Sequence, residues 1–102
     1  MLNHWLQKMS KVYSFEALIK KVSDQDATYI EVPFDIKKEF GKGRVKVEAK
    51  FDEVLYNGYI VNMSLKNEDG SICYIIGINK DIRKKLNKET GDSILVEIKE
   101  SV

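Results

Sequence analysis

Two basic runs give this chain its clearest capacity for binding chemistry. Residues 37–50 and 80–88 hold 11 of the 17 lysines and arginines but only three of the 16 acidic residues. Lysine and arginine side chains attract phosphate groups, and this attraction supplies much of the affinity of DNA-binding proteins. The candidate nucleic-acid-binding residues are therefore Lys37, Lys38, Lys42, Arg44, Arg83, Lys84, Lys85 and Lys88.

A solvated surface is the competing interpretation of these runs. The chain has 15 lysines and only two arginines, whereas arginine makes the commonest specific contact to bases. Arg83 has Asp81 and Asp92 close by in the sequence, which favours a structural ion pair for it. The net charge of +1 points to neither nucleic acid nor membrane as a partner.

Residues able to catalyse a reaction are scarce. The single histidine is His4, near the N-terminus, so Cys73 has no evident base. The sequence shows no nucleophile with its base, no metal-ligand cluster and no phosphate-binding loop. We therefore expect no enzyme, no catalytic residue, no cofactor and no metal. Tyr56, Tyr59 and Met63 offer a lining for a ligand pocket, although such side chains on a strand more often fill a core.

Length and cysteine content predict one domain in a reducing compartment. A chain of 102 residues, 43% of them hydrophobic, is long enough to bury one core. Cys73 is the single cysteine, in a pattern typical of a small buried hydrophobe, and the sequence begins without a secretory segment. We therefore expect a cytoplasmic protein. We expect no membrane association, because no apolar run approaches the roughly 20 residues of a membrane-spanning helix.

Alternating apolar residues predict a chain that is mainly β. Residues 1–11 lack a clear period and are predicted to be an N-terminal appendage to a single β-barrel domain over residues 12–102. Strands are expected over residues 13–22, 29–32, 45–51, 55–65, 72–78 and 94–98.

Short helices are expected between these strands. Apolar residues four apart share a helix face in residues 36–40 and again in residues 82–86. Gly41 and Asn87 follow these segments and suit the left-handed conformation that ends a helix. Gly58 marks either a bulge or, after Asn57, a hairpin turn in the strand around it.

The strand, helix, strand pattern occurs twice, over residues 30–50 and 76–99. Aligned with an offset of 46 and then 49 residues, the two copies share seven identities. Phe40 is also aligned with Leu86, so the same helix position is apolar in both copies. Two such units related by a pseudo-twofold axis can close into one β-barrel, which removes exposed strand edges. The alternative explanation of the seven identities is that any two strand, helix, strand units share alternating apolar residues and lysines, without a duplication.

The second copy resembles a known half-barrel. Residues 78–86, followed by Gly91, Asp92 and residues 94–96, are similar to the half-barrel of AbrB and MazE type DNA-binding proteins. In those proteins two chains pair to form one barrel. A chain that carries both copies resembles a version in which one polypeptide supplies both halves.

Residues 29–100 resemble more closely the DUF1905 family, a bacterial domain of unknown function. The resemblance is carried by residues 30–33, 40–41, 61–63, 74–77, 80–83 and 91–92. It implies a fold that is mainly β with short helices, a single-chain double-split β-barrel from an internal duplication, capped by two short helices. Members often stand beside a YdeI/OmpD-associated domain, which we expect to be absent because the sequence ends at Val102. The resemblance transfers no activity and no catalytic residue.

These observations together favour an uncharacterised, non-catalytic binding or interaction module whose partner is an unknown protein. The alternatives are a DNA-binding regulator that resembles the AbrB class and a small-ligand-binding accessory domain. Basic residues of both copies on one surface would favour nucleic acid. A closed apolar cavity with a few polar groups would favour a small ligand.

Overall fold

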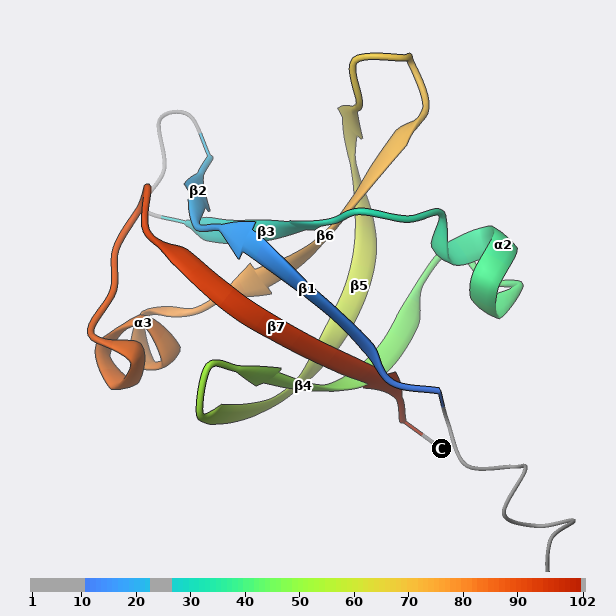
Figure 1. Cartoon of the computed structure of the whole chain (residues 1–102). Helices are drawn as coiled ribbons and strands as arrows, with labels where there is room; N and C mark the ends of the chain where they lie inside the picture. The colour runs from blue at the N-terminus through green and yellow to red at the C-terminus, as the bar shows by residue number, and fades with distance from the viewer. Residues whose placement is uncertain (1–10, 23–26, 102) are drawn as a thin grey trace, which may run out of the picture.

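The computed structural model describes residues 11–22 and 27–101, drawn in colour in Figure 1. The predicted appendage, residues 1–11, lies outside the described residues except for Lys11. The described part is mainly β with two short helices, as the sequence predicts. Its elements are β1 (Tyr13–Leu18), β2 (Lys20–Lys21), β3 (Thr28–Val32), α2 (Ile36–Phe40), β4 (Val45–Phe51), β5 (Val54–Lys66), β6 (Ile72–Ile78), α3 (Lys80–Leu86) and β7 (Ser93–Glu100).

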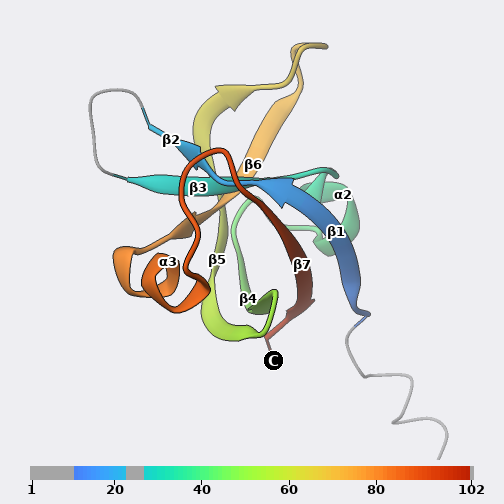
Figure 2. The same ribbon diagram turned by 60° about the vertical axis from the view of Figure 1, so that its left-hand side comes forward.

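The seven strands of the described part form one antiparallel sheet that curls into a nearly closed barrel (Figures 1 and 2). The strand order is β1-β7-β4-β5-β6-β3-β2. The two ends of the sheet belong to one stretch of chain, because only Ile19 separates β1 from β2. The N–H of Ile19 donates to the Asp92 carbonyl at 2.9 Å, and the N–H of Gly91 donates to the Ile19 carbonyl at 2.8 Å. The segment around Ile19 therefore joins the two sheet ends.

The long strand β5 also changes partner along its length. Its first half pairs with β4, from Val54 to Ile60, and its second half pairs with β6, from Ile60 to Lys66. Ile60 stands at the change and is fully buried. The pairing with β6 shifts register between Asn62 and Lys66. One continuous strand thus spans two parts of the barrel wall.

The prediction that Gly58 marks a bulge or a turn is wrong. Gly58 lies inside the regular ladder of β5, opposite Val47, and the hairpin turn falls earlier, at residues 52–53. Its role is packing, because a Cβ at Gly58 would lie 2.4 Å from Cε2 of Tyr56. The Tyr56 ring covers the backbone of Gly58, as aromatic residues often do beside a strand glycine.

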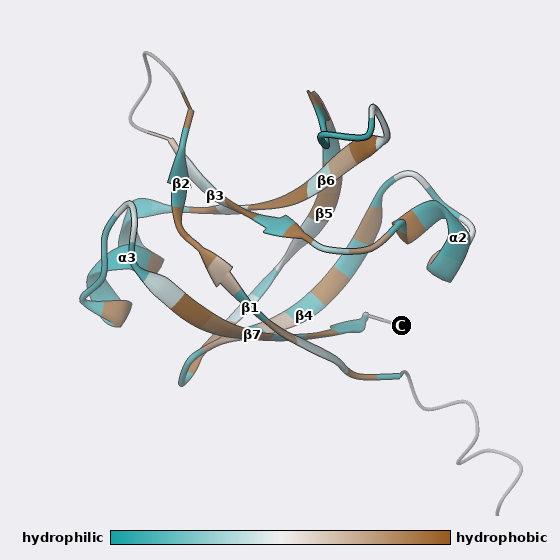
Figure 3. Cartoon of the chain, turned by 45° about the horizontal axis from the view of Figure 1, so that its top comes forward, coloured by the Kyte–Doolittle hydropathy of each residue, from teal (hydrophilic) through white to brown (hydrophobic). Residues whose placement is uncertain are grey.

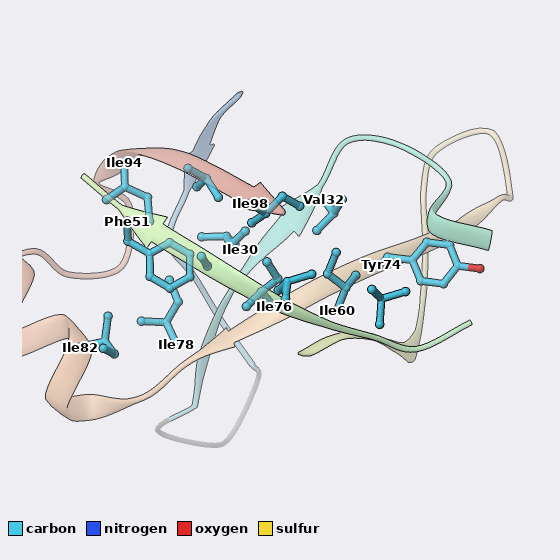
Figure 4. Close-up of a cluster of buried hydrophobic side chains, with 14 of the residues drawn as sticks. Ile30, Val32, Phe51, Ile60, Tyr74, Ile76, Ile78, Ile82, Ile94 and Ile98 are labelled. Atoms are coloured by element: carbon cyan, nitrogen blue, oxygen red, sulfur yellow. The ribbon is translucent and has the colours of Figure 1, made fainter. Parts of the chain in front are cut away.

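The core fills the barrel with the inward side of each strand. Strands β4 and β7 alternate buried with less buried residues, the period expected when one face packs inward. Figure 3 shows apolar residues on the strands and polar residues on α2 and α3, and Figure 4 shows the ring of Phe51 among the core isoleucines. The buried residues of the core are Ile19, Ile30, Val32, Ile36, Val45, Val47, Ala49, Phe51, Ile60, Tyr74, Ile76, Ile78, Ile82, Ile94, Val96 and Ile98.

Strand β6 is buried on both faces, as its continuous apolar sequence predicts. Tyr74 and Ile76 belong to the core cluster, whereas Cys73 and Ile75 are buried on the opposite face of the strand. Cys73 is 2% exposed, which confirms its prediction as a small buried hydrophobe. Burial also raises the pKa of the Cys73 thiol, which disfavours the reactive thiolate.

The two helices close opposite ends of the barrel (Figure 1). Helix α2 begins after Asp35, whose carboxylate accepts hydrogen bonds from the N–H groups of Lys37 and Lys38. It ends at Gly41 and α3 ends at Asn87, both in the predicted left-handed conformation, with φ of 75° and 56°. Ile36 and Ile82 are buried, and Phe40 and Leu86 pack against the core from partly buried positions. Within the described residues, neither helix has the length and apolar character needed to cross a membrane.

Asp52 joins the β4–β5 turn to α3 and β7. Its Oδ2 lies 2.8 Å from Nζ of Lys88, and its Oδ1 accepts a hydrogen bond of 2.9 Å from the N–H of Leu95. Asp52 takes a φ of 52°, a left-handed conformation that aspartate and asparagine tolerate better than most residues. The hydrogen bond from Lys88, followed by that from Leu95, holds the pKa of the Asp52 carboxyl below its usual value.

This carboxylate should make the stability of the barrel depend on pH. Because the pKa is lower in the folded chain, ionised Asp52 stabilises the fold above about pH 4, and this contribution is lost as pH falls through the folded pKa. We expect Asp52→Asn, which preserves shape and tolerance of positive φ, to lower stability at neutral pH and to flatten the loss of stability in acid. Urea unfolding across this pH range measures both effects.

The control for this experiment is Glu53→Gln, an exposed substitution in the same turn. That variant should keep the stability profile of the parent protein. An Asp52→Asn variant that loses stability in acid as steeply as the parent protein would show that the ion pair with Lys88 does not contribute to the profile.

Candidate functional site

The eight candidate nucleic-acid-binding residues lie at two ends of the barrel. Four belong to α2 or the loop after it, and four belong to α3 or the loop after it. Figures 1 and 3 place α2 and α3 at opposite ends. The structure therefore does not gather all eight on one surface. The two sets are Lys37, Lys38, Lys42 and Arg44, and Arg83, Lys84, Lys85 and Lys88.

Two of these lysines are held in ion pairs with the barrel itself. Nζ of Lys42 lies 2.9 Å from Oε2 of Glu100. Nζ of Lys88, paired with Asp52, also donates a hydrogen bond of 2.6 Å to the carbonyl of Ser93. Their charges are neutralised locally, so their first role is structural.

Arg44 is placed differently from the lysines of its set. The central carbon of its guanidinium lies 4.3 Å from the ring centroid of Tyr59, a cation–π contact. Tyr59 is on β5, and its side chain is 43% exposed on the outside of the barrel. This contact brings Arg44 to the outer surface of β5.

An open groove begins beside Tyr59, between strands β5 and β6 and the first turn of α3. Its volume is about 690 Å³, and it lies largely open to solvent. Figure 2 shows α3 beside the part of β5 that borders it. The residues that line it are Ala27, Thr28, Tyr56, Asn57, Gly58, Tyr59, Gly77, Ile78, Asn79, Lys80 and Arg83.

The lining of this groove favours an anion. Lys80 and Arg83 supply positive charge, and no aspartate or glutamate is among the described residues that line it. Asn79 is fixed at the start of α3, where its Oδ1 accepts a hydrogen bond of 2.8 Å from the N–H of Ile82. Beside Lys80 and Arg83, a phosphate or carboxylate would meet cationic donors of the kind that bind such groups most strongly.

The floor of the groove is open next to Tyr59. Tyr59 precedes Ile60 and Gly77 follows Ile76, the first pair of the β5–β6 ladder, and both Tyr59 and Gly77 line the groove. Gly77 is exposed, and a Cβ there would have no neighbour within 4 Å. The missing side chain leaves space beside the Tyr59 ring. A flat ring could stack there on the tyrosine.

The prediction that Tyr56, Tyr59 and Met63 could line one pocket holds for the tyrosines only. Met63 borders a separate hollow of about 280 Å³ with Tyr29, Leu65 and Ile75. Tyr56 lines the groove and packs beside Phe51 of the core, with ring centroids 5.8 Å apart. Tyr59 is therefore the groove tyrosine whose ring is free of the core.

Acid–base and metal-binding groups do not gather at this groove. Over residues 11–22 and 27–101, no group of three or more histidine, cysteine, aspartate or glutamate side chains is placed to hold a metal ion. The groove instead combines two cations, two tyrosines and two asparagines. These side chains are able to stack on rings, attract anions and form hydrogen bonds.

Comparison with known protein families shows the family of this chain. Residues 15–98 match the family described as "Domain of unknown function (DUF1905)". The chain belongs to the DUF1905 family. The match begins in β1 and ends in β7, so this DUF1905 domain includes the strands and the helix that form the groove. No curated protein matches the chain.

The sequence identified only part of the DUF1905 groove. Arg83 and the two tyrosines were candidates for binding, whereas Asn57, Gly77 and Asn79 carried no signal. The usable signal was the arginine count. The chain has two arginines among 17 basic residues. Arg83 lines this groove, and Arg44 contacts the ring of Tyr59, one of the lining residues.

Proposed function

We propose that this DUF1905 domain is a non-catalytic binding module whose groove holds a nucleotide, a ligand that joins a flat ring to a phosphate. The observation that carries the proposal is that one arginine, Arg83, lines the groove and the other, Arg44, contacts the ring of Tyr59, which also lines it. Every other basic residue is a lysine.

The chemistry of arginine supports this ligand. A guanidinium is planar, binds phosphate through two parallel hydrogen bonds and stacks on aromatic faces, whereas a lysine ammonium is a compact point charge. A chain that uses lysine elsewhere on its surface has little need of arginine for solubility alone. Arg83 and Lys80 suit the phosphate, and Tyr59 beside Gly77 suits the ring.

Duplex binding of the AbrB kind is the second candidate, and the placement of charge disfavours it. The basic residues of α2 and α3 lie at opposite ends of the barrel (Figure 1). Lys42 and Lys88 are also occupied by Glu100 and Asp52. The groove likewise favours a small ligand over the protein partner that the sequence suggested. The cytoplasmic location remains part of the proposal, since Cys73 has no second cysteine to pair with.

We also propose that the barrel arose by the predicted internal duplication and has the double-split topology. The strand pairing supports this, because β3 pairs with its counterpart β6, and β4 with its counterpart β7. In addition, β5 pairs with β4 and then β6, just as the β1–β2 segment pairs with β7 and then β3. Ile60 and Ile19 stand at the two changes of partner. The resemblance of residues 78–86, Gly91, Asp92 and 94–96 to AbrB and MazE half-barrels remains part of this proposal.

Adenosine monophosphate tests the nucleotide proposal. In a titration followed by backbone amide NMR, we expect shifts at Asn57, Tyr59, Gly77 and Lys80, and weaker binding of adenosine or inorganic phosphate alone. Tyr59→Ala should weaken binding by roughly 5- to 150-fold, the usual effect of losing one aromatic stacking partner.

The matched control is Met63→Ala, which truncates an exposed side chain of the same strand that borders the separate hollow and should leave binding unchanged. Because Tyr59 is exposed, its truncation should not unfold the barrel, and circular dichroism checks this. No shift at the groove amides with the nucleotide in large excess would refute the proposal.

A further inference from the structure

We infer that the bound nucleotide belongs to a single strand of RNA or DNA that continues from the groove along α3. This inference rests on the proposed function and extends it. It starts from a second hollow, of about 540 Å³, on the other side of Lys80 and Arg83. The residues that line this second hollow are Lys80, Arg83, Lys84, Asn87, Lys88, Glu89 and Asp92.

The two hollows share a wall. Lys80 and Arg83 line both of them, so a ligand that fills the groove lies next to the second hollow across these two cations. A phosphate bound by Lys80 and Arg83 would therefore sit between two spaces. One space takes the ring that stacks on Tyr59, and the other is open to the next unit of a chain.

Charge in the second hollow fits a phosphodiester backbone. Lys84 adds a third cation beyond the two that a single nucleotide phosphate would use. Glu89 and Asp92 also line it, Asp92 Oδ2 accepts a hydrogen bond of 2.8 Å from the N–H of Glu89, and Lys88 is paired with Asp52. Lys80, Arg83 and Lys84 outnumber these two carboxylates, and their positive charge extends along α3, past the space that one nucleotide occupies.

Positive charge also lies on the far side of Tyr59. Lys46 is directly opposite Tyr59 in the pairing of β4 with β5, and Arg44 contacts the Tyr59 ring. Both side chains are exposed. Cations thus flank the tyrosine on the β4 side and on the α3 side. This order of cation, aromatic ring and cation is the arrangement by which proteins bind single strands.

A single strand fits this surface better than a duplex. Stacking on Tyr59 needs an accessible base face, which a duplex hides within its own stack. The basic residues of α2, which a broad duplex footprint would require, lie at the other end of the barrel (Figure 3). The ligand is therefore a flexible strand a few nucleotides long. The inference covers both ribose and deoxyribose strands.

Fluorescence anisotropy with labelled oligonucleotides of roughly eight nucleotides, within the usual site size of single-strand binders, tests this inference. We expect oligouridine or oligothymidine to bind more tightly than adenosine monophosphate and more tightly than a hairpin duplex. Three cation contacts predict that the affinity of the strand falls roughly 20-fold between about 50 mM and about 200 mM salt. Binding of oligouridine alone would identify RNA as the source, and equal binding would show that the sugar is not read.

A charge reversal separates this inference from the nucleotide proposal. Lys84→Glu should weaken oligonucleotide binding at least about tenfold, because it places a negative charge on the path of the backbone, yet it should leave adenosine monophosphate binding nearly unchanged. Lys38→Glu is the matched control, since Lys38 is an exposed lysine of the opposite helix. It should affect neither ligand.

Two outcomes would overturn the inference. If adenosine monophosphate binds the groove but the strand binds no more tightly and Lys84→Glu has no effect, the ligand is a free nucleotide and only the proposed function stands. If the strand binds but Tyr59→Ala leaves its affinity unchanged, the strand binds elsewhere and the inference is wrong, whereas the nucleotide proposal is decided by the adenosine monophosphate titration alone.

Discussion

Replacing Phe51 by alanine should lower the free energy of unfolding by about 3–5 kcal/mol, the usual cost of removing a buried aromatic ring. Phe51 is fully buried and is the largest of the fully buried side chains in the described chain. Figure 4 shows its ring among Ile78, Ile94 and other core side chains. The barrel wall is hydrogen-bonded around this ring, so the wall cannot collapse freely into the space that alanine would leave. Urea unfolding at neutral pH measures the loss.

Leu55→Ala is the control for this prediction. Leu55 lies just beyond the same hairpin turn but is 78% exposed, so its truncation should change stability by less than about 0.5 kcal/mol. A similar small cost for Phe51→Ala would mean that the ring does not fill the barrel. Because Phe51 also packs beside Tyr56 of the groove, the experiment tests whether the core supports the candidate site.

Replacing Ile19 by alanine should cost about 2–5 kcal/mol and should loosen the closure of the barrel. Ile19 is 1% exposed and links the strand that pairs with β7 to the strand that pairs with β3. Its backbone hydrogen bonds to Asp92 and Gly91 hold this link. We therefore expect faster amide hydrogen exchange at Ile19 and Gly91 in addition to the loss of stability, and both are measurable on one sample.

Leu18→Ala provides the comparison within the same segment. Leu18 adjoins Ile19 but is 52% exposed, so its truncation should cost little and leave the exchange at Gly91 unchanged. Equal effects of the two variants would contradict the assignment of Ile19 as the closing residue. Ile60→Ala should resemble Ile19→Ala, because Ile60 is fully buried at the corresponding change of partner in β5.

Local patterns in the sequence were enough to find both helices and most strands, but the single strand predicted over residues 13–22 is divided at Ile19 into β1 and β2. Two patterns show which face of an element is buried: the alternation from Val45 to Phe51 and the four-residue spacing of Ile36 and Phe40. Each pattern extends over only a few residues, so it can be recognised in the sequence. Gly41 was found for a similar reason, since a left-handed helix end favours a residue without Cβ strain. These features depend on neighbours in the sequence alone.

The role of Gly58 was not predictable from local sequence patterns. In the sequence it looks like a break in a strand, whereas its absent side chain makes room for the ring of Tyr56 within an unbroken ladder. The function of a glycine inside a strand depends on what packs over it. That neighbour is chosen by the fold and leaves no local pattern.

The candidate site required the tertiary structure for the same reason. Tyr59, Gly77 and Arg83 come from β5, β6 and α3, and only the fold brings these three residues to one groove. Lysines that look equivalent in the sequence also separated into different roles. Lys88 is tied to Asp52, whereas Lys84 is exposed along the second hollow.

The sequence by itself determined the strands, the two short helices and the face that each element buries. These features follow from hydrophobic periodicity and from helix-end residues, which act over short distances. The tertiary structure alone decided that one segment closes the barrel at Ile19, that Arg44 contacts Tyr59 and that Arg83 lines the same groove as Tyr59. Such contacts join residues far apart in the chain. They are fixed by strand register and barrel closure, which no local pattern encodes.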